Sequence, residues 1–135
     1  MPLDLQVVTP ERELVHEQVE EVQVPGKDGY IGVLPGHAAL LGQLGIGELS
    51  YRGGGGARYL AIHGGFLEIR DDHVRVLADA AERPEEIDIE RARRAESHAQ
   101  QSQHGAMDPN LGLDPAEAVA AVLRAQTRIA VAGRR

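Results

Sequence analysis

The sequence predicts an α+β protein, in which a β-sandwich over residues 1–84 is followed by an antiparallel two-helix hairpin over residues 85–135. Before residue 84, short runs of alternating apolar residues are separated by turn signals, as in a small all-β domain. Beyond it the alternation stops, and strong helix formers such as Ala, Glu, Arg and Gln dominate. The chain also has 16 glycines and only 3% aromatic residues, which indicates an aliphatic core and many turns.

Apolar residues two positions apart mark the predicted strands, because alternate side chains of a strand point to the same face. Turn signals lie between these runs, at Pro25–Gly29, at Gly53–Gly56 and at Asp71–Asp72. With a mean strand length of about 5–6 residues, the segment has room for about eight to ten antiparallel strands. The alternating residues are Leu3, Leu5 and Val7, Val22 and Val24, Ile31 and Val33, Leu60 and Ile62, Leu67 and Ile69, and Val74 and Val76.

The first helix is predicted over Glu85 to Gln103, which is rich in helix-forming residues. Its apolar stripe is thin and consists mainly of alanines, so this helix buries little surface alone and must pack against another element. The stripe comprises Ile89, Ala92, Ala95 and Ala99.

A second helix is predicted after a connecting loop over Gly105–Gly112. Asp114, Pro115 and Glu117 provide an N-cap residue, a proline at the first helical position and an acid at the third. Two thin stripes pack closely but weakly, so the hairpin is expected to be the least stable part of the chain and able to leave the sandwich. The predicted stripe of the second helix comprises Val119, Val122, Leu123, Ile129 and Ala130.

The charge of −7 is unevenly distributed and argues against nucleic acid as a partner. Residues 1–90 carry 17 acidic and 7 basic side chains, whereas residues 91–135 carry 4 acidic and 7 basic ones. The chain has no cysteine, which excludes disulfides and thiolate chemistry. Its opening residues lack the pattern of a cleaved signal, and no stretch reaches eighteen uncharged apolar residues, so we expect a soluble protein that is not exported.

Three features of the sequence are candidates for chemical sites. The glycines at 53–56 are not followed by Gly-Lys-Ser/Thr, so they indicate a hairpin tip rather than a phosphate-binding loop. The six histidines lack the paired spacing of a zinc site. His63 beside Gly64 has no nucleophile or acid near it in sequence and is interpreted as a strand-end residue. A metal-dependent sandwich enzyme of the cupin type is the alternative from a different class, which bound zinc, iron or manganese would favour.

Four segments resemble, in order, the epsilon subunit of the bacterial F-type ATP synthase. They are Leu-Gln-Val-Val-Thr-Pro at 5–10, Leu-Pro-Gly-His-Ala-Ala-Leu-Leu at 34–41, Ile-His-Gly-Gly-Phe-Leu-Glu-Ile at 62–69 and Val-Arg-Val-Leu-Ala-Asp-Ala-Ala at 74–81. The resemblance implies a ten-stranded sandwich in the central stalk, bound to the gamma subunit, the ring of c subunits and the alpha/beta catalytic subunits. It also implies a non-catalytic role in coupling proton or sodium flow to ATP synthesis, peripheral to the cytoplasmic face of the cell membrane, with no cofactor required.

The resemblance further implies an interface with the c-ring and gamma. Its candidate residues are Lys27, Asp28, Tyr30, Pro35 and His37. Tyr30 stands where many relatives carry an acidic or polar residue, which is a departure from the family pattern.

Residues 87–92, Ile-Asp-Ile-Glu-Arg-Ala, resemble the (Ile/Leu)-Asp-x-x-Arg-Ala motif through which some bacterial epsilon subunits bind ATP. The resemblance implies a regulatory nucleotide held by Asp88 and Arg91, with Arg124 and Arg128 bracketing the phosphates. In the alternative interpretation, Asp88 only caps the first helix and Arg91 lies on its solvated face.

The second helix ends in a basic segment with Arg124, Arg128, Arg134 and Arg135. The resemblance implies that this helix extends to an acidic loop of the catalytic beta subunits and inhibits ATP hydrolysis. The alternative is a solvated helix face with a frayed tail, in a coupling subunit that has no regulatory role.

Overall fold

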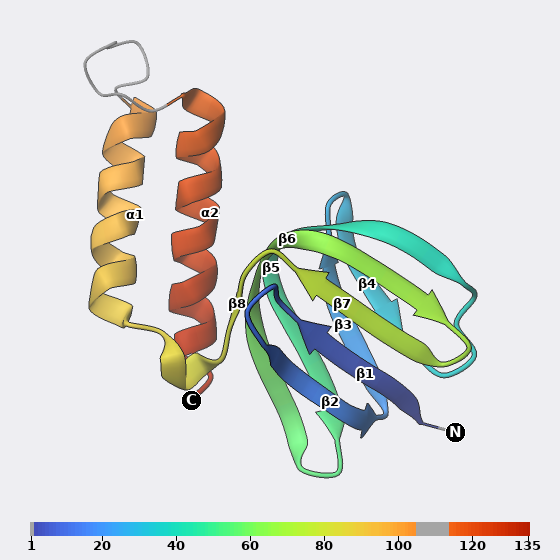
Figure 1. The fold of residues 1–135 in the computed structure, drawn as a ribbon. Coiled ribbons are helices and arrows are strands. Elements are labelled where there is room, and N and C mark those ends of the chain that lie inside the picture. The colour runs from blue at the N-terminus through green and yellow to red at the C-terminus, as the bar shows by residue number, and fades with distance from the viewer. Residues whose placement is uncertain (1, 105–113) are drawn as a thin grey trace.

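The computed structural model describes residues 2–104 and 114–135 of the chain, and the predicted loop at 105–112 lies outside the described residues. A β-domain is followed by two antiparallel helices that lie beside it (Figure 1). The strands are β1 Leu3–Val8, β2 Glu13–Val19, β3 Glu21–Gly26, β4 Gly29–Val33, β5 Leu40–Gly53, β6 Gly56–Arg70, β7 His73–Ala78 and β8 Ala81–Glu82. A short 3-10 helix, η1 Pro84–Glu86, leads to α1 Ile89–His104 and α2 Pro115–Ala132.

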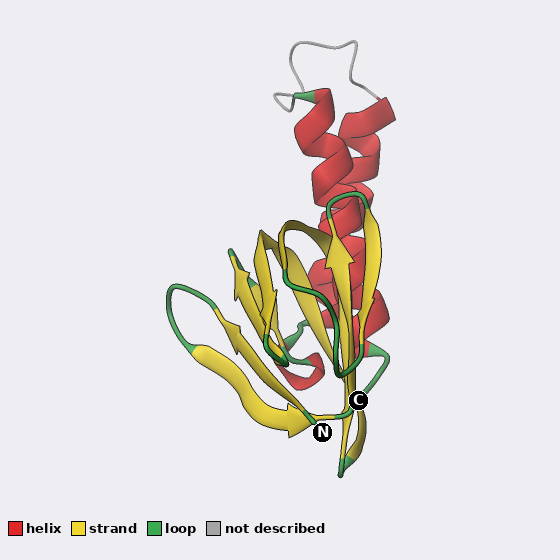
Figure 2. Cartoon of the chain, turned by 90° about the vertical axis from the view of Figure 1, so that its right-hand side faces the viewer, coloured by secondary structure: helices red, strands yellow, loops and turns green. Residues whose placement is uncertain are grey.

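The strands form one sheet in the order β2-β1-β7-β6-β5-β3-β4, with β8 paired to β6. Figure 2 shows this sheet folded on itself around its interior. Two expectations were wrong in detail. The sheet is mixed rather than antiparallel, because β1 runs parallel to β7, and a chain that returns after some sixty residues is free to pair in either direction. The described part of the chain also has eight strands rather than ten.

The strand count differs because β5 and β6 are long and continuous, with 14 and 15 residues. Their pairing is interrupted once, between Leu44↔Gly65 and Ile46↔His63. On one side of this break β6 pairs with β7, and on the other side it pairs with β8. Each long strand therefore serves both parts of the folded sheet, and dividing each at the break would give the ten strands that were expected.

Glycine is required at this break. Gly65 has a φ of 124°, and a Cβ added there would lie 2.1 Å from the carbonyl oxygen of Leu77. Any larger residue would therefore both strain the backbone and push β7 away from β6. The Gly-Gly pair at 64–65 thus allows β6 to pass through the bend while it keeps its partner.

One aliphatic core fills the interior of the sandwich, as the alternating pattern predicted. The predicted turns also form, since Gly26 pairs with Gly29, Gly53 with Gly56, and Arg70 with His73. The largest fully buried side chains are Leu3, Leu5, Leu49, Ile62, Leu67, Ile69, Val7, Val19, Val22, Val24, Val33 and Val74.

The two helices pack through alanines. Ala92 and Ala99 of α1 and Ala118 and Ala125 of α2 are buried. The predicted stripe of α2 was wrong at Val119, Leu123 and Ala130, which are exposed, while Val122 and Ile129 are half-buried. The physical reason is that small side chains let two helices approach closely, so Ala118 and Ala125 occupy the seam and shift the buried face away from Val119 and Leu123.

The N-terminal ends of both helices are defined by aspartate caps. Asp114 accepts a hydrogen bond from the Glu117 amide at 3.3 Å, as predicted. The first helix begins at Ile89 instead of Glu85, because η1 ends before it and Asp88 caps it. No helix in the described part of the chain has the length and apolar character needed to cross a lipid bilayer.

The hairpin contacts the sandwich through α2, which lies against β5 and β6, while α1 forms the outer layer (Figure 1). A small second apolar cluster joins the two parts, with Ala61 of β6, Ile87 of the connector, and Val131 and Ala132 at the end of α2. The C-terminal end of α2 is therefore the docked end of the hairpin.

Candidate functional site

A cleft of about 310 Å³ opens where the sandwich, the connector and the hairpin meet. It contains three of the four residues predicted to bind ATP, namely Asp88, Arg91 and Arg128. The fourth, Arg124, is not part of it, because it pairs with Glu117 of its own helix at 2.5 Å. The remaining lining residues are Glu82, Glu86, Ala92 and Ala95.

Asp88 acts as the N-cap of α1. Its Oδ1 accepts a hydrogen bond from the backbone amide of Arg91 at 3.1 Å, and its carbonyl accepts one from Ala92 at 3.0 Å. Such a cap satisfies amide groups that the first helical turn leaves without partners. The motif therefore has a structural role in the start of the helix, while the exposed Arg91 side chain faces the cleft.

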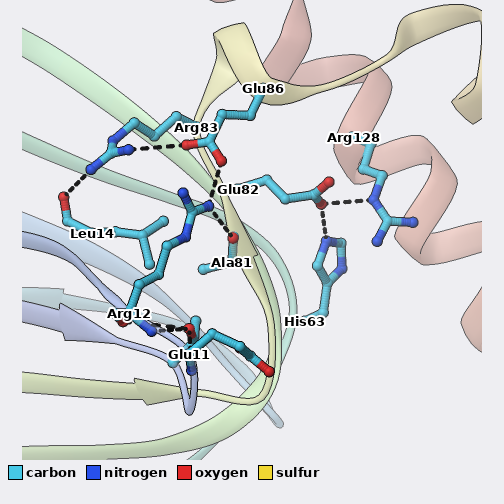
Figure 3. A network of polar contacts seen from close by, with 10 residues as sticks. Glu11, Arg12, Leu14, His63, Ala81, Glu82, Arg83, Glu86 and Arg128 are labelled. Carbon is cyan, nitrogen blue, oxygen red and sulfur yellow. Dashed lines mark hydrogen bonds and ion pairs between the residues drawn. The ribbon is translucent and has the colours of Figure 1, made fainter.

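The most buried polar contact of the region joins three elements (Figure 3). Oε1 of Glu82 on β8 accepts hydrogen bonds from Nε of Arg128 on α2 at 2.7 Å and from Nε2 of His63 on β6 at 2.9 Å. Partial burial raises the pKa of the Glu82 carboxyl, but the hydrogen bonds from His63 and Arg128 outweigh it and leave this pKa below its ordinary value. We call His63, Glu82 and Arg128 the Glu82 clasp.

A second network holds the connector against the sandwich (Figure 3). Glu86 of η1 accepts hydrogen bonds from Arg12 and, at 3.1 Å, from Nη1 of Arg83. Nη2 of Arg83 also donates to the carbonyl of Leu14 at 2.8 Å. Burial raises the pKa of Glu86, but its two arginine partners outweigh burial and lower it, and Glu86 in turn raises the pKa of Arg12. These contacts do not involve either long helix.

The two C-terminal arginines bind the body of the protein rather than fraying into solvent. Arg134 forms a two-pronged pair with Glu48, at 3.2 and 3.1 Å, and its guanidinium lies 4.5 Å from the ring centre of Tyr59. Its pKa is raised by the hydrogen bond to Glu48. Arg135 donates to the carbonyls of Pro84, at 2.9 Å, and Ile87. The end of α2 is therefore fastened to β5 and to the connector.

The five residues predicted to contact the ring or gamma all lie along one edge strand, β4. Lys27 and Asp28 form the turn before it, and Pro35 and His37 belong to the loop after it. Tyr30 lies within the strand, and its hydroxyl accepts a hydrogen bond from the Glu48 amide at 3.1 Å. Because β4 is the last strand in the sheet order, these residues follow a free edge. Lys27, Asp28 and Tyr30 line one groove, whereas Pro35 and His37 lie outside it.

Sequence reasoning missed an exposed apolar strip that crosses three strands. Leu41 of β5, Phe66 of β6 and Leu77 of β7 are 79%, 58% and 42% exposed. Phe66 pairs directly with Leu77 and is diagonal to Leu41, since Leu41 pairs with Glu68. A groove of about 840 Å³ runs beside Leu41 and Phe66 and reaches the turn at 27–28. We call Leu41, Phe66 and Leu77 the apolar strip.

The sequence contained a signal for this strip. In each of these strands an apolar residue stands next to another one, as in Leu40-Leu41, Phe66-Leu67 and Val76-Leu77. Where one member of such a pair faces the core, the other must face outward, because neighbouring side chains of a strand point to opposite faces. Such doubled apolar positions indicate a surface that is meant to be covered.

The Glu82 clasp was also missed. His63 was interpreted as a strand-end residue without an acid near it in sequence, but it is buried in the middle of β6 and its acid comes from β8. Only the pairing of β6 with β8 brings the two together, and a strand of two residues gives no periodic signal. Among the described residues, no three His, Asp or Glu side chains converge to hold a metal ion, so nothing there supports the cupin-type alternative.

Comparison with known proteins agrees with this architecture. Residues 2–84 match the family model of the ATP synthase delta/epsilon chain β-sandwich domain. The chain is 62% identical to an ATP synthase epsilon chain of Solibacter usitatus, over 98% of this chain and 97% of the relative. It is 50% identical to that of Koribacter versatilis, over 73% of this chain and 69% of the relative.

Among solved structures, a chain in the mitochondrial ATP synthase of Euglena gracilis superposes with a TM-score of 0.80 at 24% identity, covering 96% of this chain and 80% of that one. This likeness extends over both the sandwich and the helices and supports the fold. The family match to the sandwich and the near full-length similarity to the Solibacter protein lead to one assignment: the chain belongs to the ATP synthase delta/epsilon chain family.

Proposed function

We propose that this protein is the epsilon subunit of the central stalk of a bacterial ATP synthase. In this role it performs no chemistry and couples rotation of the c-ring to ATP synthesis in the catalytic alpha/beta head, at the cytoplasmic face of the cell membrane. The family assignment supports the proposal. So does the fold shared with a chain in the structure of the Euglena gracilis mitochondrial ATP synthase with its OSCP, F1 and c-ring. Sustained ATP turnover by the purified chain, abolished by a single substitution, would contradict it.

The apolar strip is the observation that carries the proposal. Large apolar side chains that are exposed side by side on a well-packed domain mark a surface covered by a partner. The strip is bordered by the charged turn at Lys27 and Asp28, which gives an apolar centre with a polar rim. We assign the strip to the gamma subunit and the free edge of β4, with Tyr30 and His37, to the polar loops of the c-ring.

This assignment is tested with the gamma subunit and the c-ring in a reconstituted complex. Phe66→Glu places a charge in the centre of the strip and is expected to abolish co-purification with gamma, whereas Glu20→Gln, an exposed change outside both surfaces, is expected to have no effect. Because the chain has no native cysteine, single cysteines at Tyr30 and His37 report their neighbours without background. Cross-links from both positions to gamma, and none to the c subunit, would overturn the division of the two surfaces.

The hairpin is proposed to regulate the enzyme by binding ATP in the cleft at Asp88, Arg91 and Arg128. Arg91 faces this cleft, and the neighbouring Arg128 adds a second cation for the phosphates. The cleft also contains Glu82 and Glu86, and Glu82 already accepts a hydrogen bond from Arg128. A nucleotide must compete with these carboxylates, so we expect weak binding, with a Kd in the range of about 0.1–1 mM.

Calorimetric titration of ATP into the whole protein tests this sensor. Arg91→Ala removes a cation and is expected to weaken binding at least about tenfold. Asp88→Asn keeps a good N-cap residue but removes the carboxylate charge, whereas Asp88→Ala removes both. A loss of binding in Asp88→Ala that Asp88→Asn restores would show a capping role only. No heat of binding to the unaltered protein at millimolar ATP would exclude the sensor.

The inhibitory role proposed for the extended hairpin depends on arginines that the docked hairpin already uses. Arg128, Arg134 and Arg135 are all bound to the sandwich or the connector. Extension toward acidic groups of the catalytic subunits therefore exchanges one set of ionic partners for another. Deletion of residues 114–135 is expected to raise ATP hydrolysis by the reconstituted catalytic complex. Unchanged hydrolysis would favour the alternative, a coupling subunit without regulation.

A further inference from the structure

Ionic contacts join the C-terminal part of the chain to the sandwich. There are two such ion pairs among the described residues. Arg134 pairs with Glu48 just after the end of α2, and Arg128 pairs with Glu82 from within α2. Arg134 of the first pair is exposed and lies beyond the end of the helix, although the Glu48 side chain is only 20% exposed. The second lies within the helix, and a buried side chain donates a hydrogen bond to its carboxylate.

That supporting side chain is His63, which is only 4% exposed. Its Nε2 donates to the same Oε1 of Glu82 that accepts from Arg128, because a carboxylate only accepts hydrogen bonds. Its other ring nitrogen, Nδ1, is buried and has no partner among the described residues. A buried polar atom without a hydrogen-bond partner destabilises the folded protein. His63 therefore carries an energetic cost, and the hydrogen bond that its ring donates goes to Glu82.

Glu82 is also placed where it limits what Arg128 can bind. The Glu82 carboxylate accepts a hydrogen bond from the Arg128 guanidinium on the side of the sandwich, at the rim of the cleft that contains Asp88 and Arg91. The neighbouring Glu86 does not share this task, because its partners are Arg12 and Arg83 of the sandwich and connector. Glu82 and Glu86 are four residues apart in the chain. Glu82 binds the hairpin, whereas Glu86 holds the connector against the sandwich.

We propose that the Glu82 clasp holds the hairpin in its docked position. Glu82 accepts the hydrogen bond from Arg128 of α2, and His63 is a positioning residue that fixes the Glu82 carboxylate. The apolar contact at the docked end involves small side chains, Ala61 and Ala132, together with Val131 and Ile87, and leaves a large share of the docking energy to polar contacts. The clasp sets the ratio of docked to undocked hairpin in the protein itself, and it does so whether or not a nucleotide binds.

The docked-to-undocked ratio is measurable in the full chain by energy transfer. Cysteines introduced at exposed positions Glu20 of the sandwich and Gln126 of α2 carry the two dyes, and no native cysteine interferes. Glu82→Gln removes the charge but keeps the shape, and it is expected to lower the ratio about tenfold or more, since a hydrogen bond between charged groups is worth about 1.5–3 kcal/mol. Glu86→Gln changes the matched carboxylate, whose hydrogen bonds go to Arg12 and Arg83 rather than to α2, and it is expected to leave the ratio unchanged.

A double-mutant cycle separates the effect of the clasp on the docked-to-undocked ratio from a general loss of protein stability. Arg128→Gln alone is expected to lower the ratio as Glu82→Gln does, and the double variant is expected to add little more. Arg124→Gln is the matched control on the same helix, because the partner of Arg124 among the described residues is Glu117 of α2 itself. Fully additive losses, or an equal loss in either control, would overturn the proposal.

His63 has its own test as a positioning residue. His63→Phe removes the donor and keeps a ring of similar size, so the docked ratio is expected to fall about threefold to tenfold. His63→Gln supplies an N–H donor again and is expected to recover part of the ratio. In the Glu82→Gln background, His63→Phe is expected to have no further effect on docking. An undiminished effect there would show that His63 acts through the core and not through Glu82. If His63→Phe fails to fold, the cycle with Arg128→Gln, a change outside the sandwich, still decides the proposal.

Discussion

The sandwich and the hairpin bury very different side chains. The sandwich packs Leu, Ile and Val from every long strand into one core, each worth about 1.5–3 kcal/mol when buried. The helices bury mainly alanines in their seam, and they meet the sandwich through one small cluster and a few ionic contacts. We therefore expect the sandwich to supply most of the stability of the fold, and we propose that polar contacts decide the posture of the hairpin.

Gly65→Val is expected to prevent folding of the sandwich, at a cost of more than about 4 kcal/mol. The new side chain would meet the Leu77 carbonyl and would require a φ that valine strongly disfavours. Gly133→Ala at the end of α2 is the comparison, because its backbone has an ordinary φ of −69°. We expect this second change to alter stability by about 1 kcal/mol or less. Circular dichroism with denaturant unfolding measures both, and a folded Gly65→Val variant would contradict the assigned bend.

Leu67→Ala is expected to lower the free energy of unfolding by about 2–5 kcal/mol, since it leaves a cavity in the sandwich core. Leu123→Ala removes an equal number of atoms from α2, where the side chain is 45% exposed, and is expected to cost about 0.5 kcal/mol or less. Urea unfolding of both variants compares the two regions directly. Similar losses would show that the hairpin contributes to the same cooperative unit as the core.

Truncation after Arg83 is expected to leave a sandwich that folds cooperatively and still binds gamma. The deletion uncovers Ala61 and His63 but removes no member of the main core, so we expect a loss of about 3 kcal/mol or less. The urea dependence of the fragment and its co-purification with gamma are the measurements. An unfolded fragment would place the domain boundary of residues 1–84 elsewhere.

Acidification is expected to release the hairpin before it unfolds the sandwich. The folded-state pKa of Glu82 lies below its ordinary value of 4.5 because of its contacts with His63 and Arg128. Its contribution is therefore fully present above about pH 4.5 and is lost as the pH falls through the folded-state pKa. The folded-state pKa of Glu86 is also lowered, so its contribution at the connector is likewise lost as the pH falls. Energy transfer between Glu20→Cys and Gln126→Cys labels, followed with far-UV dichroism, separates release from unfolding. The Glu82→Gln variant should lack most of the change.

Most of the sandwich was predictable from the sequence because its information is local. Alternation identifies the buried face of each strand, and Asp71-Asp72 with its positive φ values, 51° and 62°, forms the turn that its composition predicts. The direction of β1 and the continuity of β5 and β6 were not predictable, because they depend on pairings between distant segments. Local patterns do not report which of two distant edges a strand will join.

The candidate site was predictable only in part. The sequence identified Asp88, Arg91 and Arg128, which the structure brings to one cleft, whereas the predicted Arg124 lies outside it. The stripe of α2 was wrong at Val119 and Leu123, since hydrophobicity alone does not reveal that close helix packing selects alanine. Glu82 was overlooked because its partners lie 19 residues before it and 46 residues after it in the chain. Their convergence is a property of the fold.

The uninterrupted course of β5 and β6 has a mechanical consequence. The two strands run side by side from Leu40 and Ile69 to the tip at Gly53 and Gly56, and no loop interrupts either of them at the bend. In the proposed coupling role, a twisting load that enters near the apolar strip would pass along the covalent backbone of both strands to the opposite end of the sandwich. Two halves linked by flexible loops would instead absorb part of each rotation. On this proposal the long strands transmit the load, and the hairpin lies beside them.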